Sequence, residues 1–351
     1  MAYDLAYTDL LMDMLAIPAV SRDESQRSDF LEKFIGNLGF QVNRIHNNLL
    51  VGDLKAQDPR PRILLNSHMD TVSPVEAWES DPYTPIIEGD KITGLGSNDA
   101  GASVVSMIAT FKEMKNKLEE RMDLMLLIGA EEEVSGQQGI TAVLPELEDL
   151  DAVIVGEPTG MNPAVAERGL LVLDGEAKGL AGHAAREEGE NAIYKAIKDI
   201  EHIKRLKFES KSEWLPEPGA KVTMISAGTS HNVVPDVCRF VVDVRSNDQY
   251  GNEYLLEVIR EACESELMPR STRLKPSGLP NDHFMMETIQ ACKLEPFGSF
   301  TLSDMALIPF PAIKMGPGDS ARSHTAGEYI LKSELEMGIK TYCHFLDNIK
   351  A

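Results

Sequence analysis

Three short runs of almost uninterrupted apolar residues constrain the fold more than any other feature of the chain. They read RILLN at residues 62–66, DLMLLIGA at 123–130 and AVIVGE at 152–157. A strand with one face in water alternates apolar and polar residues, whereas a strand covered on both faces is apolar throughout. Longer amphipathic stretches lie around the runs, including residues 24–37 and 99–118. The pattern predicts an α/β fold in which helices cover both faces of a mostly parallel sheet.

After residue 165 the pattern changes to strand, helix, strand, strand, helix, strand. We expect these six elements at residues 168–179, 190–207, 221–228, 237–246, 252–266 and about 271–277. The order β-α-β-β-α-β is that of a ferredoxin-like unit. The α/β pattern then resumes and ends in a long helix at 332–349. The sequence therefore predicts a discontinuous catalytic α/β domain at residues 1–165 and 275–351, interrupted by an inserted α+β domain at 166–274.

The charge and the apolar content argue against two classes of partner. The 351 residues carry 34 Lys and Arg against 56 Asp and Glu, a formal net charge of −22, whereas nucleic acid requires basic patches. No apolar stretch approaches the roughly 18 residues that span a bilayer, and the acidic N-terminal segment predicts an amphipathic helix rather than a signal peptide. The four cysteines form no C-x-x-C pair, so we interpret them as reduced packing residues of a cytoplasmic protein.

Ionisable side chains that can bind a metal follow the predicted buried strands or lie in glycine-rich segments before helices. The carboxyl ends of strands in an open α/β sheet line one crevice, where residues from separate segments meet. The candidates are His68, Asp99, Glu131, Glu132, Glu133, Glu157 and His324. Each of them alone is more often a capping or solvated residue, and it is their coincidence that favours one site. Imidazole and carboxylate ligands without thiolates suit Zn²⁺, Mn²⁺ or Co²⁺.

Two aspartates have further predicted roles in such a site. Asp99, expected at the N-cap of the helix at 99–118, can place one oxygen on each of two metals. Asp70 lies on the same side of an extended segment as His68, so it can accept the imidazole N–H and fix the tautomer. Four other histidines lack a comparable position and are interpreted as structural: His46, His202, His283 and His344.

Seven motifs between about residues 60 and 330 carry a resemblance to a known family: HMDTV, GLGSNDAG, GAEEEVSGQQG, VGEPTG, GLAGHAA, HNVVPD and SHTAGEY. Together they resemble the two-zinc hydrolases that include aminoacylase, acetylornithine deacetylase and succinyl-diaminopimelate desuccinylase. The resemblance is closest to acetylornithine deacetylase. It implies a catalytic α/β domain with an inserted ferredoxin-like dimerisation or lid domain, and therefore a homodimer. It also implies two divalent metal ions, zinc in the first place, with cobalt or manganese as alternatives.

The resemblance assigns roles to the candidate residues. Asp99 would bridge the two metals. One metal would be completed by His68 and Glu157, and the other by Glu133 and His324.

In the same resemblance Glu132 would be the catalytic base, supported by Asp70 next to the metal ligands. The alignment of the three consecutive acids leaves an alternative, in which a shift by one residue makes Glu131 the base and Glu132 the ligand. The chain also departs from many relatives, which have Lys-Gly after the bridging aspartate where this sequence has Ala100 and Gly101.

Five further residues are candidates for substrate binding by the same resemblance. His183 and Asn232 belong to the insert, and the histidine would reach the active site of the other subunit. Arg245 at a strand end would bind a substrate carboxylate, although an internal salt bridge is an equally good interpretation. Gly316 and Gly318, in GPGDS, would contact that carboxylate through backbone N–H groups.

We therefore expect a metal-dependent amidohydrolase acting on a small-molecule N-acyl amino acid, with N-acetyl- or N-succinyl-ornithine of arginine biosynthesis favoured. Succinyl-diaminopimelate desuccinylases, dipeptidases and carboxypeptidases of the same family keep the same ligands and remain alternatives. A non-catalytic relative would lack the base or a ligand, and all of them are present. An aminopeptidase of related two-zinc architecture is less favoured, because it gives no reason for the insert with His183.

Overall fold

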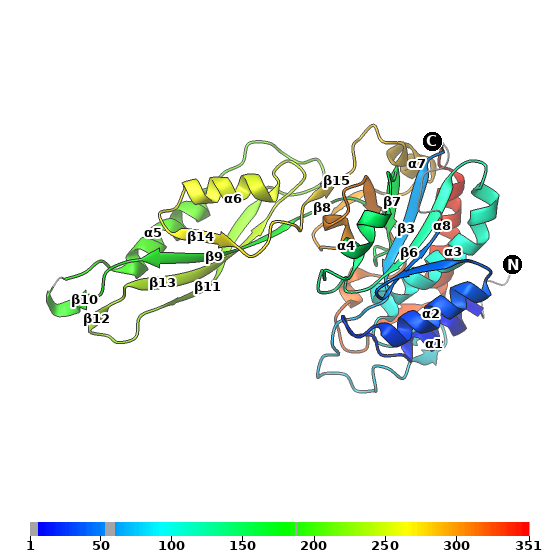
Figure 1. Cartoon of the computed structure of the whole chain (residues 1–351), viewed down its shortest axis with the longest axis horizontal. Helices are drawn as coiled ribbons and strands as arrows, with labels where there is room; N and C mark the ends of the chain where they lie inside the picture. Colours follow the sequence, from blue (N-terminus) through cyan, green and yellow to red (C-terminus); the bar gives the residue numbers. More distant parts are fainter. Residues whose placement is uncertain (1–5, 53–59, 187, 351) are drawn as a thin grey trace. The chain divides into compact units, whose positions relative to one another are not determined.

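The computed structural model describes residues 6–52, 60–186 and 188–350. The chain forms two compact units (Figure 1). The first comprises the described residues within 1–165, 279–297 and 303–351, and the second comprises Ala166–Gly278 and Gly298–Leu302.

The first unit is built on a sheet with the order β1-β2-β6-β3-β7-β17-β8. The central strands β6, β3, β7 and β17 are parallel to one another, whereas β2 pairs with β6, β1 with β2, and β8 with β17 in antiparallel fashion. The bounds are β1 Val42–Ile45, β2 Asn48–Val51, β3 Arg62–His68, β6 Asp123–Gly129, β7 Ala152–Val155, β8 Ala164–Glu167 and β17 Ala312–Lys314. The chain passes into the second unit through β8 and returns through β15 (Ser277–Gly278), which pairs with it; β16 (Phe297–Ser299) also pairs with β8.

Helices cover both faces of this sheet, and its central strands are therefore buried along almost their whole length. The helix α3 packs on β3, β6 and α8, and α4 packs with Leu64, Leu127 and Val153 on the opposite face. The helices are α1 Ala6–Leu15, α2 Ser25–Asn37, α3 Ala102–Leu118, α4 Ile140–Val143, α7 Phe284–Ala291 and α8 Lys332–Asp347. A small sheet adds β4 Ile86–Glu88, β5 Lys91–Thr93 and β18 Tyr329–Leu331. The predicted α/β class is confirmed.

The second unit has a four-stranded antiparallel sheet with the order β11-β13-β9-β14. In chain order its strands therefore lie 2-3-1-4, with helices α5 and α6 packed through Ala196, Ile203 and Leu255 onto Leu173 and Val242 (Figure 1). The bounds are β9 Leu170–Lys178, α5 Ala192–Arg205, β11 Gly219–Ala227, β13 Val237–Arg245, α6 Asn252–Glu261 and β14 Glu266–Pro269. A short hairpin is formed by β10 (Gly182–His183) and β12 (Val233–Val234). The predicted order β-α-β-β-α-β agrees with these main elements.

Two local predictions were wrong. Asp99 is not the N-cap of a helix: it has extended backbone angles (φ −122°, ψ 96°) in a π-helical turn at Ser97–Gly101, and α3 begins at Ala102. The last strand of the second unit lies at Glu266–Pro269 rather than at 271–277. The backbone of the segment after it forms hydrogen bonds with a side chain instead, since the buried Asn252 amide donates to the carbonyls of Thr272 and Leu274.

In the part of the chain that the structure describes, no helix has the length and apolar character needed to cross a bilayer. All four cysteines are free thiols.

We expect the substitution Asn252→Asp to destabilise the second unit by about 3 kcal/mol or more, because a carboxylate would face three carbonyl oxygens that now accept from the amide. Urea unfolding followed by circular dichroism measures the effect. The control is Glu257→Gln, an acid–amide exchange at an exposed position of the same helix, which should leave the unfolding curve unchanged. Equal curves for both variants would contradict this account of Asn252.

Candidate metal centre

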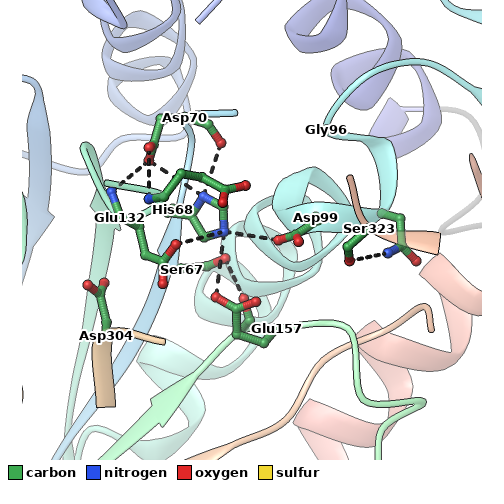
Figure 2. Close-up of polar contacts among 12 residues, drawn as sticks. Ser67, His68, Asp70, Gly96, Asp99, Glu132, Glu157, Asp304 and Ser323 are labelled. Atoms are coloured by element: carbon green, nitrogen blue, oxygen red, sulfur yellow. Dashed lines mark hydrogen bonds and ion pairs between the residues drawn. The ribbon is translucent and has the colours of Figure 1, made fainter. Parts of the chain in front are cut away.

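His68 is the last residue of β3, and its imidazole is buried between carboxylates. Its Nε2 atom lies 3.2 Å from Asp99 Oδ1, 3.5 Å from Glu157 Oε1 and 3.9 Å from Glu132 Oε2 (Figure 2). Its Nδ1 atom faces the other way and lies 3.0 Å from the carbonyl oxygen of Asp70. With Nδ1 protonated and donating to that carbonyl, Nε2 presents its lone pair to the space between the three carboxylates.

Asp99 lies between the two histidines of the cluster. While Oδ1 faces His68, Oδ2 lies 3.6 Å from His324 Nε2. The same His324 nitrogen is 3.0 Å from Glu133 Oε2. One carboxylate thus offers a separate oxygen to each of two neighbouring sets of ligands, an arrangement that suits a bridge between two metals.

The three consecutive acids after β6 point in different directions. Glu131 has a left-handed backbone (φ 55°), and its Oε2 accepts from the Gln138 N–H at 3.2 Å. Glu132 and Glu133 instead face His68 and His324. The side chain of Glu131 therefore closes its own turn, and the two following acids belong to the cluster.

Asp70 holds this turn as well as the imidazole. It is fully buried, and its carboxylate accepts from the backbone N–H groups of Glu132 and Glu133 at 3.1 and 3.2 Å and from Ser21 Oγ at 2.7 Å. Burial alone would raise the pKa of Asp70, but the contacts with His68 and Ser21 lower it below its usual value. The sequence suggested only the contact with His68.

The electrostatics of the cluster favour a cation. Burial first, and then the repulsion of neighbouring carboxylates, raises the pKa of Glu132 and of Glu157 well above the usual value. Burial lowers the pKa of His68, but the surrounding carboxylates raise this pKa by more than burial lowers it. The pKa of His68 therefore lies well above its usual value. The pKa of His324 is raised to about 9, mainly by its hydrogen bond to Glu133.

Among the described residues, two groups bring their ligand atoms within 4.8 Å of one another: His68, Asp99 and Glu133, and His68, Glu132 and Glu157. A set of imidazole nitrogens and carboxylate oxygens with excess negative charge fits Zn²⁺, Co²⁺ or Mn²⁺. The donor chemistry of this cluster therefore fits a pair of divalent ions.

The candidate substrate residues of the insert lie in the second unit. His183 is exposed on β10, and the Ala184 N–H that follows it donates to the carbonyl of Asn232 at 3.1 Å, so the two candidates lie side by side. Arg245 forms a bidentate pair with Asp243, from Nε at 2.8 Å and Nη2 at 3.0 Å. The internal salt bridge considered for Arg245 is present, and a role in substrate binding stays a prediction.

Gly316 and Gly318 lie in the first unit and pack against the loops that carry the ligands. A Cβ atom on Gly318, which has φ +94°, would lie 2.3 Å from Asn98 Oδ1, and one on Gly316 would lie 2.5 Å from the Glu157 carbonyl. The Gly316 N–H already donates to Thr159 Oγ1 at 3.1 Å. Close packing therefore requires both glycines, and their contact with a substrate remains a prediction.

Several buried polar residues around the cluster were missed by the sequence reasoning. Glu24 accepts from the Glu131 N–H at 3.2 Å, and Arg27 donates to the Met69 carbonyl at 2.7 Å. Asp304 accepts from Asn66 at 2.9 Å and contributes to the raised pKa of Glu132. The buried Glu328 accepts from three backbone N–H groups around Asp99. Of these residues, only Glu328 could have been suspected from the sequence, since it lies in the motif SHTAGEY with His324.

Comparison with known proteins agrees with this geometry. The model of a family described as "Peptidase family M20/M25/M40" matches residues 64–348. A succinyl-diaminopimelate desuccinylase of Dinoroseobacter shibae is 26% identical over 268 residues, covering 72% of this chain and 70% of the relative. A [LysW]-lysine/[LysW]-ornithine hydrolase of Saccharolobus solfataricus is 26% identical over 348 residues, covering 95% and 93%.

Among solved structures, the aminopeptidase PepT of Bacillus cereus aligns with a TM-score of 0.78 at 19% identity, covering 98% of both chains. The likeness shows a common fold that includes the insert. The argument that an insert disfavours an aminopeptidase was therefore wrong.

We expect chelator-treated protein to bind two equivalents of zinc, and zinc at 100 times its Kd to stabilise the fold by about 2.7 kcal/mol for each site. Asp99→Asn should bind one equivalent or fewer, because Asp99 faces both histidines. Calorimetric titration with metal analysis measures the stoichiometry. Glu131→Gln is the matched control, since that carboxylate is turned to Gln138, and it should retain two equivalents. Two tightly bound ions in Asp99→Asn would count against the bridge.

Proposed function

The chain belongs to the peptidase family M20/M25/M40, and from this premise we propose that it hydrolyses the amide bond of an N-acyl amino acid at a two-metal centre. The observation that carries the proposal is Asp99, with one oxygen facing His68 and the other facing His324. In this proposal Asp99 would be shared by the two ions, one of which would also be held by His68 and Glu157 and the other by Glu133 and His324. Zinc is the favoured metal, with cobalt and manganese as alternatives.

When bound, the two ions would lower the pKa of a water molecule and polarise the carbonyl of the scissile amide. Glu132 takes the proton of the attacking water as general base and delivers it to the leaving amine. Asp70 holds the backbone of Glu132 and Glu133 and lies against His68, so one buried carboxylate orients the base and two ligands.

The substrate that we favour is N-acetyl- or N-succinyl-ornithine. The names of two relatives contain diaminopimelate, lysine and ornithine, all of them amino acids with a second amine, which supports an acylated diamino acid. The net charge of −22 is compatible with a cationic product. Succinyl-diaminopimelate, dipeptides and the peptide substrates of an aminopeptidase are the alternatives. The four free thiols support a location of the protein in the cytoplasm, which is a reducing environment.

We further propose a homodimer formed through the second unit, with His183 acting in the active site of the partner. The strand β11 lies at the edge of its sheet, and it exposes Met224 and Ile225. The adjoining helix α5 exposes Tyr194 and Ile197, of which Tyr194 is 71% accessible. An open sheet edge beside exposed apolar side chains is a surface suited to pairing with a second copy.

We expect Glu132→Gln to lower kcat by about 10²–10⁴-fold without loss of bound zinc, because the amide cannot accept the proton of the water. Steady-state kinetics on a panel of N-acetyl, N-succinyl, dipeptide and tripeptide substrates, with metal analysis of each variant, tests both the base and the substrate class. Glu131→Gln should keep kcat within a few-fold. Loss of activity in Glu131→Gln together with retention in Glu132→Gln would reverse the assignment of the two acids.

We expect His183→Ala to lower kcat by about 10²–10³-fold, as for loss of one oxyanion donor. Mixing this variant with Glu132→Gln should restore activity, because a mixed dimer combines an intact Glu132 with a His183 from the partner. Random exchange of subunits in a symmetric dimer should yield about a quarter of parental activity. Absence of any recovery after demonstrated subunit exchange would show that His183 does not act across the interface.

A further inference from the structure

A single buried carboxylate accepts hydrogen bonds from three backbone N–H groups of the loop that carries Asp99. Glu328 is 2% exposed and lies four residues after His324. Its Oε1 accepts from the backbone N–H groups of Asn98 and Asp99, both at 2.9 Å. Its Oε2 accepts from the Gly96 N–H, also at 2.9 Å. The three donors lie within four consecutive residues of one loop, and the acceptor belongs to the segment that also carries His324.

This loop needs acceptors from outside itself. It ends where α3 begins, and the N–H groups of Gly96, Asn98 and Asp99, which lie before that helix, have their acceptor in Glu328. Asp99 has extended backbone angles, and Gly96 has a left-handed φ of +78°, so the backbone of this turn departs from helical angles at both residues. The direction of the Asp99 side chain depends on this backbone conformation, and Glu328 binds the N–H of that very residue.

A second contact joins the same two segments. The Asn98 Nδ2 atom donates to the Asp319 carbonyl at 3.1 Å and to Ser323 Oγ at 3.2 Å, and Asn98 Oδ1 accepts from the Asp319 N–H at 3.0 Å. Ser323 immediately precedes His324, and Figure 2 shows Asp99 between His68 and Ser323. The segment that carries His324 is thus tied to the Asp99 loop on both sides of the histidine.

We infer that Glu328 is a positioning residue of the metal centre: it fixes the Asp99 carboxylate relative to His324 and thereby sets the affinity for a divalent cation between them. The inference rests on the proposed two-metal centre, but not on the nature of the substrate. A carboxylate is suited to this task because both oxygens are acceptors. A glutamine at this position would turn an NH₂ group toward either the Gly96 N–H or the pair from Asn98 and Asp99.

The test compares Glu328→Gln with a matched variant, Asp199→Asn. Asp199 in the second unit is also fully buried, and its carboxylate accepts from the N–H groups of Glu264 and Ser265 at 3.0 and 2.8 Å. Both variants remove one charge from a buried carboxylate that binds backbone donors. Three quantities are measured on each: zinc affinity by competition with a chromophoric chelator, the unfolding midpoint of the metal-free protein, and kcat and KM at saturating zinc.

Glu328→Gln should weaken binding of the more weakly held zinc by about 10–100-fold, the range for loss of an outer partner of a ligand. Asp199→Asn should lower the unfolding midpoint and leave zinc affinity within about twofold of the parent. Glu328→Asp, which keeps both acceptors on a shorter side chain, should bind zinc more tightly than Glu328→Gln. A merely structural role would not produce this separation between stability and affinity.

Parental zinc affinity in Glu328→Gln, combined with a lowered unfolding midpoint, would overturn the inference. If Glu328→Gln does not fold, Glu328→Asp decides, because a tenfold weaker affinity supports the inference and an unchanged affinity overturns it. Failure of the parent protein to bind zinc, cobalt or manganese is a separate result, which would overturn the two-metal centre itself. The inference also remains distinct from the substrate proposal, since zinc affinity is measured without any substrate.

Discussion

Repulsion among closely spaced and largely buried carboxylates is the interaction on which the rest of this structure depends. Asp99, Glu132, Glu133 and Glu157 converge with His68 and His324, and repulsion among the carboxylates adds to the cost of removing them from water. Divalent cations would offset that cost. The surrounding protein holds the ligand-bearing loops through buried residues that bind backbone groups, Asp70 and Glu328 above all. The backbone of the site is therefore arranged by contacts that do not themselves require a cation.

The parts of the fold that the sequence predicted best are those in which local pattern and burial coincide. The runs at β3, β6 and β7 are apolar because both faces are covered, and this fixed the positions of His68 and Glu157 at or just after strand ends. The error at Asp99 has a physical cause. Capping preferences describe contacts within a few residues, whereas the N–H of Asp99 donates to an acceptor 229 residues later in the chain.

The remainder of the site could not be predicted from the sequence pattern, because charged residues are rarely buried. An isolated acid or arginine is therefore normally taken for a surface residue. Glu24 and Arg27 lie within or next to an amphipathic helix and look like its solvent face, yet both are buried and hold neighbouring loops. The directions of the three consecutive acids were also undetermined, since they depend on the left-handed backbone of Glu131.

The entry and exit of the second unit have a consequence for the history of the chain. The polypeptide leaves through β8 and returns through β15, and these strands are antiparallel partners in which Ser277 lies opposite Glu167. The ends of the intervening segment are therefore adjacent. Joining them directly would connect two neighbouring strands at a pair of opposite residues, at little cost in chain entropy. A domain inserted in this manner can be gained, lost or exchanged during evolution without a change in the fold of the domain that carries it.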